Sequence, residues 1–363
     1  MAKRLALDRI LFASVLILLA YGVLMVYSSS AVLSMDIYGN SYTFFIKHLV
    51  IASFAFALML FISGMDYKKL MLKRFVGLVL LASLLLLVIV LMLNPLNNTH
   101  RWIRFGMFSF QPSELAKLAV VIFMARYLAV NKEDINKKGL RILPILSVVG
   151  PLIFLVIIEP DVGTGLTILF IVLVMLFSAG LTLRYYLVGL LGLCAGIYYL
   201  VISSQYRMER ILAFLDPWAD PLGYGFQPIQ SIIAIGSGGL FGTGITAGTQ
   251  KYFYLPTPHT DFIYSVIGEE LGFVGSMVLL LLFCCIFWRG IRIALRTNND
   301  FGKYLAFGIT VMIVGQAFIN ISVALTLFPT KGIPLPLVSF GGTSMLISLV
   351  STGILLNISR YTT

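Results

Sequence analysis

Long apolar runs separated by short polar connections dominate the chain. Ten of these runs are long enough to cross a membrane, because about 20 apolar residues in a helix span the roughly 30 Å of hydrocarbon. The runs are continuous rather than alternating between apolar and polar positions, which predicts helices and not the strands of a barrel. They cover approximately residues 9–31, 44–64, 71–93, 112–130, 141–158, 163–181, 184–202, 262–288, 303–327 and 340–359.

Composition supports an all-α, polytopic integral membrane protein with a single transmembrane domain over residues 1–363. The chain is 59% hydrophobic and 11% charged, whereas a soluble domain carries about 25% charged residues. The first apolar run exceeds the roughly 7–15 residues of a signal-peptide core and no cleavage pattern follows it, so we expect it to be kept as a span. The three cysteines lie inside apolar runs and predict neither disulfides nor a metal site.

Basic residues predict the orientation of the chain in the membrane. The 26 Lys and Arg against 15 Asp and Glu occur in short clusters between apolar runs, and not in the single patch typical of nucleic-acid binding. Most of them lie on connections that share a side with the N-terminus, which predicts that both termini are cytoplasmic. On the opposite side, the long connection 203–261 contains a glycine-rich apolar stretch too short to span, so we expect one or two re-entrant or interfacial helices there.

Charged residues within the apolar runs are candidates for function, because a charge inside the membrane costs about 2.5–3.5 kcal/mol. Glu114 and Lys117 lie at i,i+3 on one helix face, where they can pair. The pair either orients the helix or lines a cavity in which an anionic ligand recruits Lys117. Glu269 and Glu270 point about 100° apart on their helix, so we expect only one of them to face a partner.

Further polar residues lie at the predicted outer ends of the spans. Asp161 follows a proline corner and suits the N-cap of the next helix. Asp261, in the stretch PTPHTDF, either caps the eighth span or serves as a proton acceptor whose pKa is raised by partial desolvation. Across from it, Lys331 and the Gly341–Gly342 start of the last span together suit a phosphate group.

Five blocks at these positions resemble the SEDS family (shape, elongation, division and sporulation). They occur in order over about residues 10–360, and the FLDPWADP and TLFPTKG forms favour the division branch over the elongation branch. Thr257 and the pair Tyr264–Ser265 depart from the usual family pattern, but neither change touches the carboxylate of the motif. The blocks are RWIRFGMFSFQPSELAKLA, EPDVGTG, FLDPWADPLGYGFQPIQSIIAIGSGGLFGTG, LPTPHTDFIYSVIGEELGFVG and NISVALTLFPTKGIPLPLVSFGGTSM.

The resemblance implies ten transmembrane helices and a peptidoglycan glycosyltransferase that polymerises lipid II at the outer face of the bacterial plasma (inner) membrane. It implies contact with membrane lipid, a class B penicillin-binding protein as partner, other division membrane proteins nearby, and no nucleic acid. The family's essential aspartate falls on Asp261. We expect the substrate to be bound by a set of polar residues around it, namely Arg101, Glu114, Lys117, Asp161, His259, Thr260, Lys331 and Ser339.

The implied reaction is an inverting displacement with Asp261 as general base. Cationic side chains, among them Arg101, Lys117 and Lys331, would stabilise the departing diphosphate. A divalent cation, Mg²⁺ or Mn²⁺, can share that task, although no ligand cluster in the sequence specifies one and no other cofactor is implied. Two alternatives remain open: a flippase for lipid II, and a non-catalytic scaffold that recruits a transpeptidase.

Overall fold

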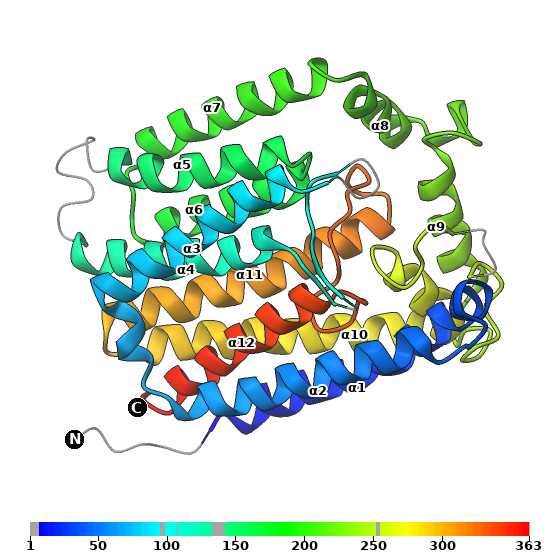
Figure 1. The fold of residues 1–363 in the computed structure, drawn as a ribbon, viewed down its shortest axis with the longest axis horizontal. Coiled ribbons are helices and arrows are strands. Elements are labelled where there is room, and N and C mark those ends of the chain that lie inside the picture. The colour runs from blue at the N-terminus through cyan, green and yellow to red at the C-terminus, as the bar shows by residue number, and fades with distance from the viewer. Residues whose placement is uncertain (1–6, 95–98, 107, 133–141, 252–254, 363) are drawn as a thin grey trace.

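The computed structural model describes residues 7–94, 99–106, 108–132, 142–251 and 255–362. Each of the ten predicted spans is a helix of one elongated bundle (Figure 1). These helices are α1 (Arg9–Tyr38), α2 (Thr43–Gly64), α3 (Lys73–Met92), α4 (Pro112–Val130), α5 (Leu143–Ile158), α6 (Val162–Ser178), α7 (Leu183–Ile202), α10 (Ile263–Arg296), α11 (Asp300–Ala324) and α12 (Gly342–Ser359).

Seven helices in the described ranges are long and apolar enough to cross a membrane: α1, α2, α3, α7, α10, α11 and α12. Helices α5 and α6 are apolar but have only 16 and 17 residues. Helix α4 carries Glu114, Lys117 and Arg126 within its 19 residues. A polytopic membrane protein is therefore clear from the structure, while ten crossings remain a prediction.

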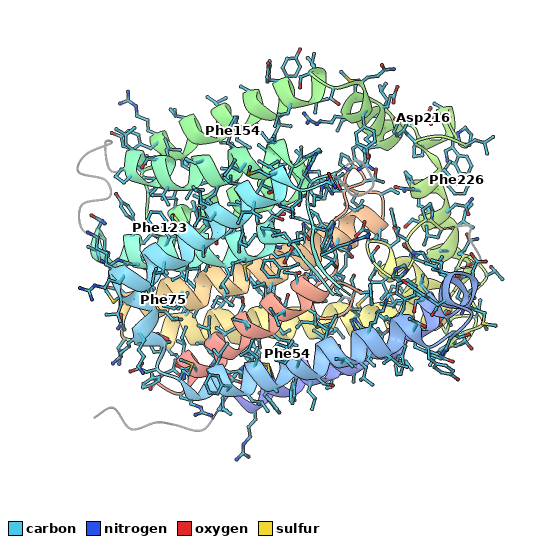
Figure 2. The ribbon with its side chains drawn as sticks, viewed as in Figure 1. Phe54, Phe75, Phe123, Phe154, Asp216 and Phe226 are labelled. Carbon is cyan, nitrogen blue, oxygen red and sulfur yellow. The ribbon has the colours of Figure 1, made fainter. Side chains whose placement is uncertain are left out.

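Burial divides the helices into an inner and an outer group. In the most apolar stretches of α11 and α12, 72% and 83% of the residues are buried. In those of α2 and α3, 22% of the residues are buried. Phe54 of α2 and Phe154 of α5, both labelled in Figure 2, are each 64% exposed. Helix α7 lies at the edge of the bundle with none of its residues buried. Apolar side chains thus fill the core and also form the outer surface of the bundle, as in a protein surrounded by lipid.

One end of the bundle gathers both termini (Figure 1). The Asp8 carboxylate accepts from the backbone N–H of Leu11 in the first turn of α1 and pairs with Arg289 of α10 at 2.5 Å. The Asp8 backbone N–H donates to the hydroxyl of Ser359 in α12. The predicted grouping of both termini at one end is confirmed, and its assignment to the cytoplasmic face stays a prediction.

The opposite end carries the hairpin and the short helices. Strands β1 (Ile103–Phe105) and β2 (Phe108–Phe110) pair antiparallel, with Arg104 opposite Ser109. The 203–261 connection contains α8 (Gln205–Leu215), η3 (Pro217–Ala219) and α9 (Phe226–Ser237). Helix α9 packs on α10, where the hydroxyls of Ser231 and Ser265 lie 2.6 Å apart. The connection thus contains short helices, and their re-entrant or interfacial placement stays a prediction.

Two features of α10 differ from the sequence prediction. The helix ends at Arg296 and not near residue 288, because its polar last turns continue beyond the apolar run, with Arg296 where the helix dipole favours a cation. The helix is also broken at Gly272, which has φ 66° and ψ −162°. Glu269 and Glu270 both hydrogen-bond to residues of the 243–251 segment at this break. The expectation that only one of them faces a partner was wrong, since the loop reaches both faces of the interrupted helix.

Candidate functional site

Asp261 lies immediately before α10 with a carboxylate that does not cap the helix. The N-cap of α10 is Phe262, and no side chain caps it. The N-cap interpretation of Asp261 was therefore wrong. The residue is held through its main chain instead, because its carbonyl accepts from the amide Nδ2 of Asn320 at 2.8 Å. The same amide donates to the carbonyl of Ile333 at 2.7 Å, so Asn320 ties the segment of Asp261 to the loop before α12.

Gly332 marks the place where Asp261 and Arg101 approach each other. A Cβ atom at Gly332 would lie 3.2 Å from Oδ2 of Asp261 and 4.0 Å from Nη1 of Arg101. Arg101 also donates from Nε to the carbonyl of Glu159 at 3.4 Å. Arg210 of α8 donates to the carbonyl of Thr330 at 3.0 Å, which anchors it to the same loop. One carboxylate and two guanidinium groups thus come together from three segments far apart in sequence.

The surroundings of Asp261 tune its basicity. Burial raises the pKa of Asp261 to about 6, and the charge of Asp161 adds to the rise, while Arg101 and Arg210 oppose it. The carboxylate is therefore anionic at neutral pH yet more basic than an exposed aspartate. A general base works best when its pKa lies near the operating pH.

Glu159, whose carbonyl accepts from Arg101, carries a neutral carboxyl group. Its side chain is fully buried, and neither carboxyl oxygen has a hydrogen-bond partner within the described ranges. Burial raises the pKa of Glu159 to about 9, with Asp161 adding to the rise and Arg101 opposing it. Because Glu159 carries no charge at pH 7, it does not neutralise Arg101, and the anion that faces this guanidinium is Asp261.

Asp161 has a structural role that the sequence anticipated. Its Oδ1 accepts from the backbone N–H of Thr164, which makes it the N-cap of α6. Its Oδ2 accepts from the amide of Gln111 at 2.9 Å and from the hydroxyl of Ser113 at 3.3 Å. Asp161 therefore joins the start of α4 to the start of α6, and it also contributes negative charge to the field at Asp261.

The predicted pair of Glu114 and Lys117 is present in α4. Oε1 of Glu114 lies 2.7 Å from Nζ of Lys117, and both side chains are buried. Lys117 also donates to Oε1 of Gln316 in α11. The amide of Gln316 in turn donates to the carbonyl of Pro334 at 2.9 Å. The ion pair is thus linked through one glutamine to the loop that carries Gly332.

His259, Thr260 and Ser339 support the loops around the carboxylate. The ring of His259 lies 5.1 Å from that of Phe44 and 5.5 Å from that of Phe340. Burial lowers the pKa of His259 to about 4, so it is neutral at pH 7. Ser339 donates its hydroxyl hydrogen to the carbonyl of Thr260 at 2.6 Å. The geometry gives these three residues packing and tethering roles, and their predicted contact with substrate stays a prediction.

Lys331 and the start of α12 were the expected phosphate-binding elements. Lys331 is partly buried, and burial lowers the pKa of its ammonium group. Its Cβ lies close to Gly163 in the first turn of α6. In the first turn of α12, Thr343 accepts from the backbone N–H of Gln111 at 2.9 Å and donates to the carbonyl of Ser109 at 3.2 Å. That turn is therefore joined to the hairpin, and phosphate binding at it stays a prediction.

The sequence patterns did not predict a role at the site for Gln316, Asn320, Arg210 or Gly332. Gln316 and Asn320 lie at i,i+4 on α11, so they share a face of an otherwise apolar helix. Two amides at that spacing inside a membrane span were a readable signal for a polar interior. Arg210 and Gly332 gave no comparable signal, because their importance depends on how distant loops meet.

The fold is a membrane-embedded helical bundle, and at one end a partly buried aspartate lies between two arginines. This arrangement suits an enzyme that acts on a membrane-anchored substrate. Residues 8–363 match the family described as cell cycle protein, whose members are FtsW, RodA and SpoVE. The chain belongs to this family, and the resemblance to SEDS proteins is confirmed.

Two curated relatives are similar over nearly their whole length. The chain is 42% identical over 361 residues to stage V sporulation protein E of Bacillus subtilis, covering 99% of this chain and 98% of that one. It is also 42% identical over 356 residues to a probable peptidoglycan glycosyltransferase FtsW of Geobacter sp., covering 97% and 96%. Equal identity to a sporulation protein and to a division protein leaves the division branch a prediction.

Solved structures share the fold. A chain from a structure described as showing coordination of polymerization and crosslinking by a peptidoglycan synthase complex has a TM-score of 0.81 at 31% identity, with 98% of both chains covered. The rod shape determining protein RodA of Thermus thermophilus has a TM-score of 0.71 at 28% identity, covering 98% of this chain and 97% of that one.

Proposed function

We propose that the chain is a peptidoglycan glycosyltransferase that polymerises lipid II at the outer face of the bacterial plasma membrane. Family membership and the names of its relatives support the activity. The placement of Asp261 is the observation that supports a mechanism. Its carboxylate is free of any capping role and faces Arg101 across Gly332.

This placement supports a single displacement step. Asp261 takes the proton from the 4-hydroxyl of the acceptor sugar as that oxygen forms a bond to the anomeric carbon of the donor. The bond from the anomeric carbon to the lipid diphosphate breaks, and the diphosphate leaves with the electron pair. The α-linked donor gives a β-linked product in this single inversion, so no second carboxylate is needed as nucleophile. A positioned base contributes typically 10²–10⁴ in rate.

Cationic side chains meet the charge that develops on the leaving diphosphate. Arg101 is suited to this role because its guanidinium lies beside the carboxylate and is not neutralised by Glu159. Arg210 of α8 is bound to the carbonyl of Thr330, in the loop that also carries Lys331. Guanidinium groups bind phosphate oxygens bidentately, which orients the leaving group as well as stabilising it.

A divalent cation at the diphosphate is the least specified part of the proposal. Within the described ranges, no three or more His, Cys, Asp or Glu side chains gather in a way that would hold a metal ion. The residues present therefore do not form a metal-binding set of their own, and we derive no step through a cation.

Polymerisation of purified lipid II tests the activity and the base. The wild-type chain should make glycan strands, and Asp261→Asn should make none while keeping its fold. Asp36→Asn, at an exposed carboxylate near the end of α1, is the matched control and should behave as the wild type. Equal product from wild type and Asp261→Asn would remove Asp261 as the base.

Two further assays separate the alternative functions. A flippase would move lipid II between leaflets of a vesicle without making strands, and a scaffold would leave Asp261→Asn fully functional in cells.

We propose a class B penicillin-binding protein as the partner that crosslinks the strands, on the basis of the structural likeness to a synthase complex that couples polymerization and crosslinking. Adding that partner to the assay should raise the yield of strands.

A further inference from the structure

A short half-helix, residues 263–271, connects Asp261 to a break in the backbone of α10. Gly272 at the break has φ 66° and ψ −162°, a conformation that is essentially restricted to glycine. An interruption of this kind releases backbone groups from the helical hydrogen-bond pattern. Within a membrane protein such groups need other partners, because an unsatisfied one costs several kcal/mol.

The segment 239–244 provides these partners. It crosses α10 at the break and hydrogen-bonds to both halves of the helix. The bonds run from the amides of Thr243 and Gly244 to the carbonyls of Glu269 and Glu270 at 2.9 and 3.0 Å, and from the amides of Phe273 and Val274 to the carbonyls of Gly239 and Leu240 at 2.9 and 3.1 Å. Backbone groups on both sides of the break therefore have partners in this segment before any side chain is considered.

A buried ion pair adds a second connection at the same place. The Glu270 carboxylate is fully buried and lies 2.7 Å from Nζ of Lys251, which is 4% exposed. It also accepts from the hydroxyl of Ser28 in α1 at 2.5 Å and from the backbone N–H of Thr246 at 3.1 Å. Lys251 donates to the Ser28 hydroxyl as well, at 3.2 Å. Three segments thus meet in one polar cluster, which we call the latch: Ser28, Lys251 and Glu270.

The latch closes a ring of chain around Asp261. Lys251 and Glu270 are 19 positions apart, and the chain between them runs through Asp261 and along the half-helix. Opening the contact would return conformational freedom to residues 255–262, which lead to the half-helix. On the far side of the ring, Asn320 and Ser339 hold the carbonyls of Asp261 and Thr260. The stretch that carries the carboxylate is therefore held from two sides.

A buried ion pair is weak evidence for stability, because the cost of removing both charges from water offsets much of their attraction. The backbone hydrogen bonds already join the 239–244 segment to both halves of α10. The ion pair of Lys251 and Glu270 additionally fixes the position of the 239–251 segment along the half-helix. We propose that Ser28, Lys251 and Glu270 are positioning residues for Asp261, which hold its carboxylate at the reacting hydroxyl without touching substrate. This proposal rests on the glycosyltransferase function proposed above.

Kinetics of latch variants test the proposal. Lys251→Met keeps the length of the stem but removes the charge, and it should lower kcat by about 10–100-fold with KM for lipid II unchanged, because misplacing a reacting group by about 1 Å can cost about 10²-fold. Lys251→Arg keeps a cation and should restore most of the activity. Glu270→Gln combined with Lys251→Met should be no worse than the more damaging single variant, since both break the same contact.

The pH dependence separates positioning from a loss of folded protein. A loosened loop lets water reach Asp261, which faces Arg101, Arg210 and Asp161. The acidic limb of the rate profile should therefore move to lower pH in Lys251→Met. A smaller amount of folded enzyme would lower the rate at every pH and leave the limb in place, and that result would overturn the proposal.

Hydrogen exchange gives a readout that needs no activity. The backbone amides of Thr257 and of residues 259–264 should exchange faster in Lys251→Met than in wild type. Lys132→Met, which removes an exposed ion pair with Asp300 at the other end of the bundle, is the control and should change nothing there. Unchanged exchange in Lys251→Met would overturn the latch. Wild type without polymerase activity would instead refute the proposed function, and the exchange result would still decide whether the latch fixes the loop.

Discussion

Removing the charge of Lys117 should destabilise the protein more than any exposed charge change. Glu114 and Lys117 are each 2% exposed and lie 2.7 Å apart. Lys117→Met fills a similar volume but leaves the Glu114 carboxylate buried without its cation, and it takes a donor from Gln316. Breaking a buried pair in this way costs about 3–5 kcal/mol.

The double variant Lys117→Met with Glu114→Leu distinguishes the pair from its parts. Two apolar side chains of suitable size can replace a buried ion pair at little cost or with a gain of about 1–4 kcal/mol. We therefore expect the double variant to be clearly more stable than Lys117→Met alone. The exposed pair of Lys132 and Asp300 is the reference, and Lys132→Met should cost less than about 1 kcal/mol.

Reversible unfolding of the purified protein in detergent micelles measures these differences, followed by the polymerase assay on the variants that remain folded. A double variant as unstable as Lys117→Met would refute the reasoning, since it would show that the loss does not come from an unpaired buried charge. A stable but inactive double variant would assign Glu114, Lys117 or both a role with the substrate, and a stable, active one would exclude that role for both.

Three further predictions follow from the site and the break. The value of kcat/KM should rise with pH through about 6 and then level off, because Asp261 must be deprotonated to accept a proton; a flat profile from pH 4.5 to 8 would exclude it as the base. Arg210→Gln should move the acidic limb to higher pH, since the guanidinium lowers the pKa of Asp261; no movement would show that Arg210 is too far away or too well solvated to act. Gly272→Ala should destabilise the fold by at least about 1–3 kcal/mol, because φ is positive and the new methyl group would lie 2.7 Å from the carbonyl oxygen of Leu240; a neutral result in thermal unfolding would mean that the break can relax.

The sequence predicted the helical elements well because each of the ten helices follows a long apolar run. The ends of α1 and α10 were less predictable, since both helices continue beyond the apolar stretch to Tyr38 and Arg296. A sequence window registers the change in polarity, whereas the helix continues until its backbone finds another partner. The break at Gly272 was invisible because a glycine inside an apolar run has many uses, and only the crossing of the 239–244 segment shows which one applies.

The candidate site was predictable in its residues but not in their roles. Asp161 as a cap and Glu114 with Lys117 as a pair depend on short sequence separations, and both are found. Asp261 as a cap was wrong, because the competing tether from Asn320 is 59 positions away. The contacts of Ser339 with Thr260 and of Arg210 with Thr330 depend likewise on how loops fold back on each other, which no local pattern contains.

The interrupted α10 also bears on how the protein is made. A continuous span can be inserted with its hydrogen bonds complete, but the two parts of α10 lack partners at Gly272 until the 239–244 segment is in place. Because the 239–244 segment precedes α10 in the chain, the ribosome synthesises it before the helix whose backbone groups it binds. Biogenesis should therefore be more sensitive to changes in this segment than its position on the periphery suggests. A variant with a disrupted 239–244 segment should be removed by membrane quality control before it reaches its site of work.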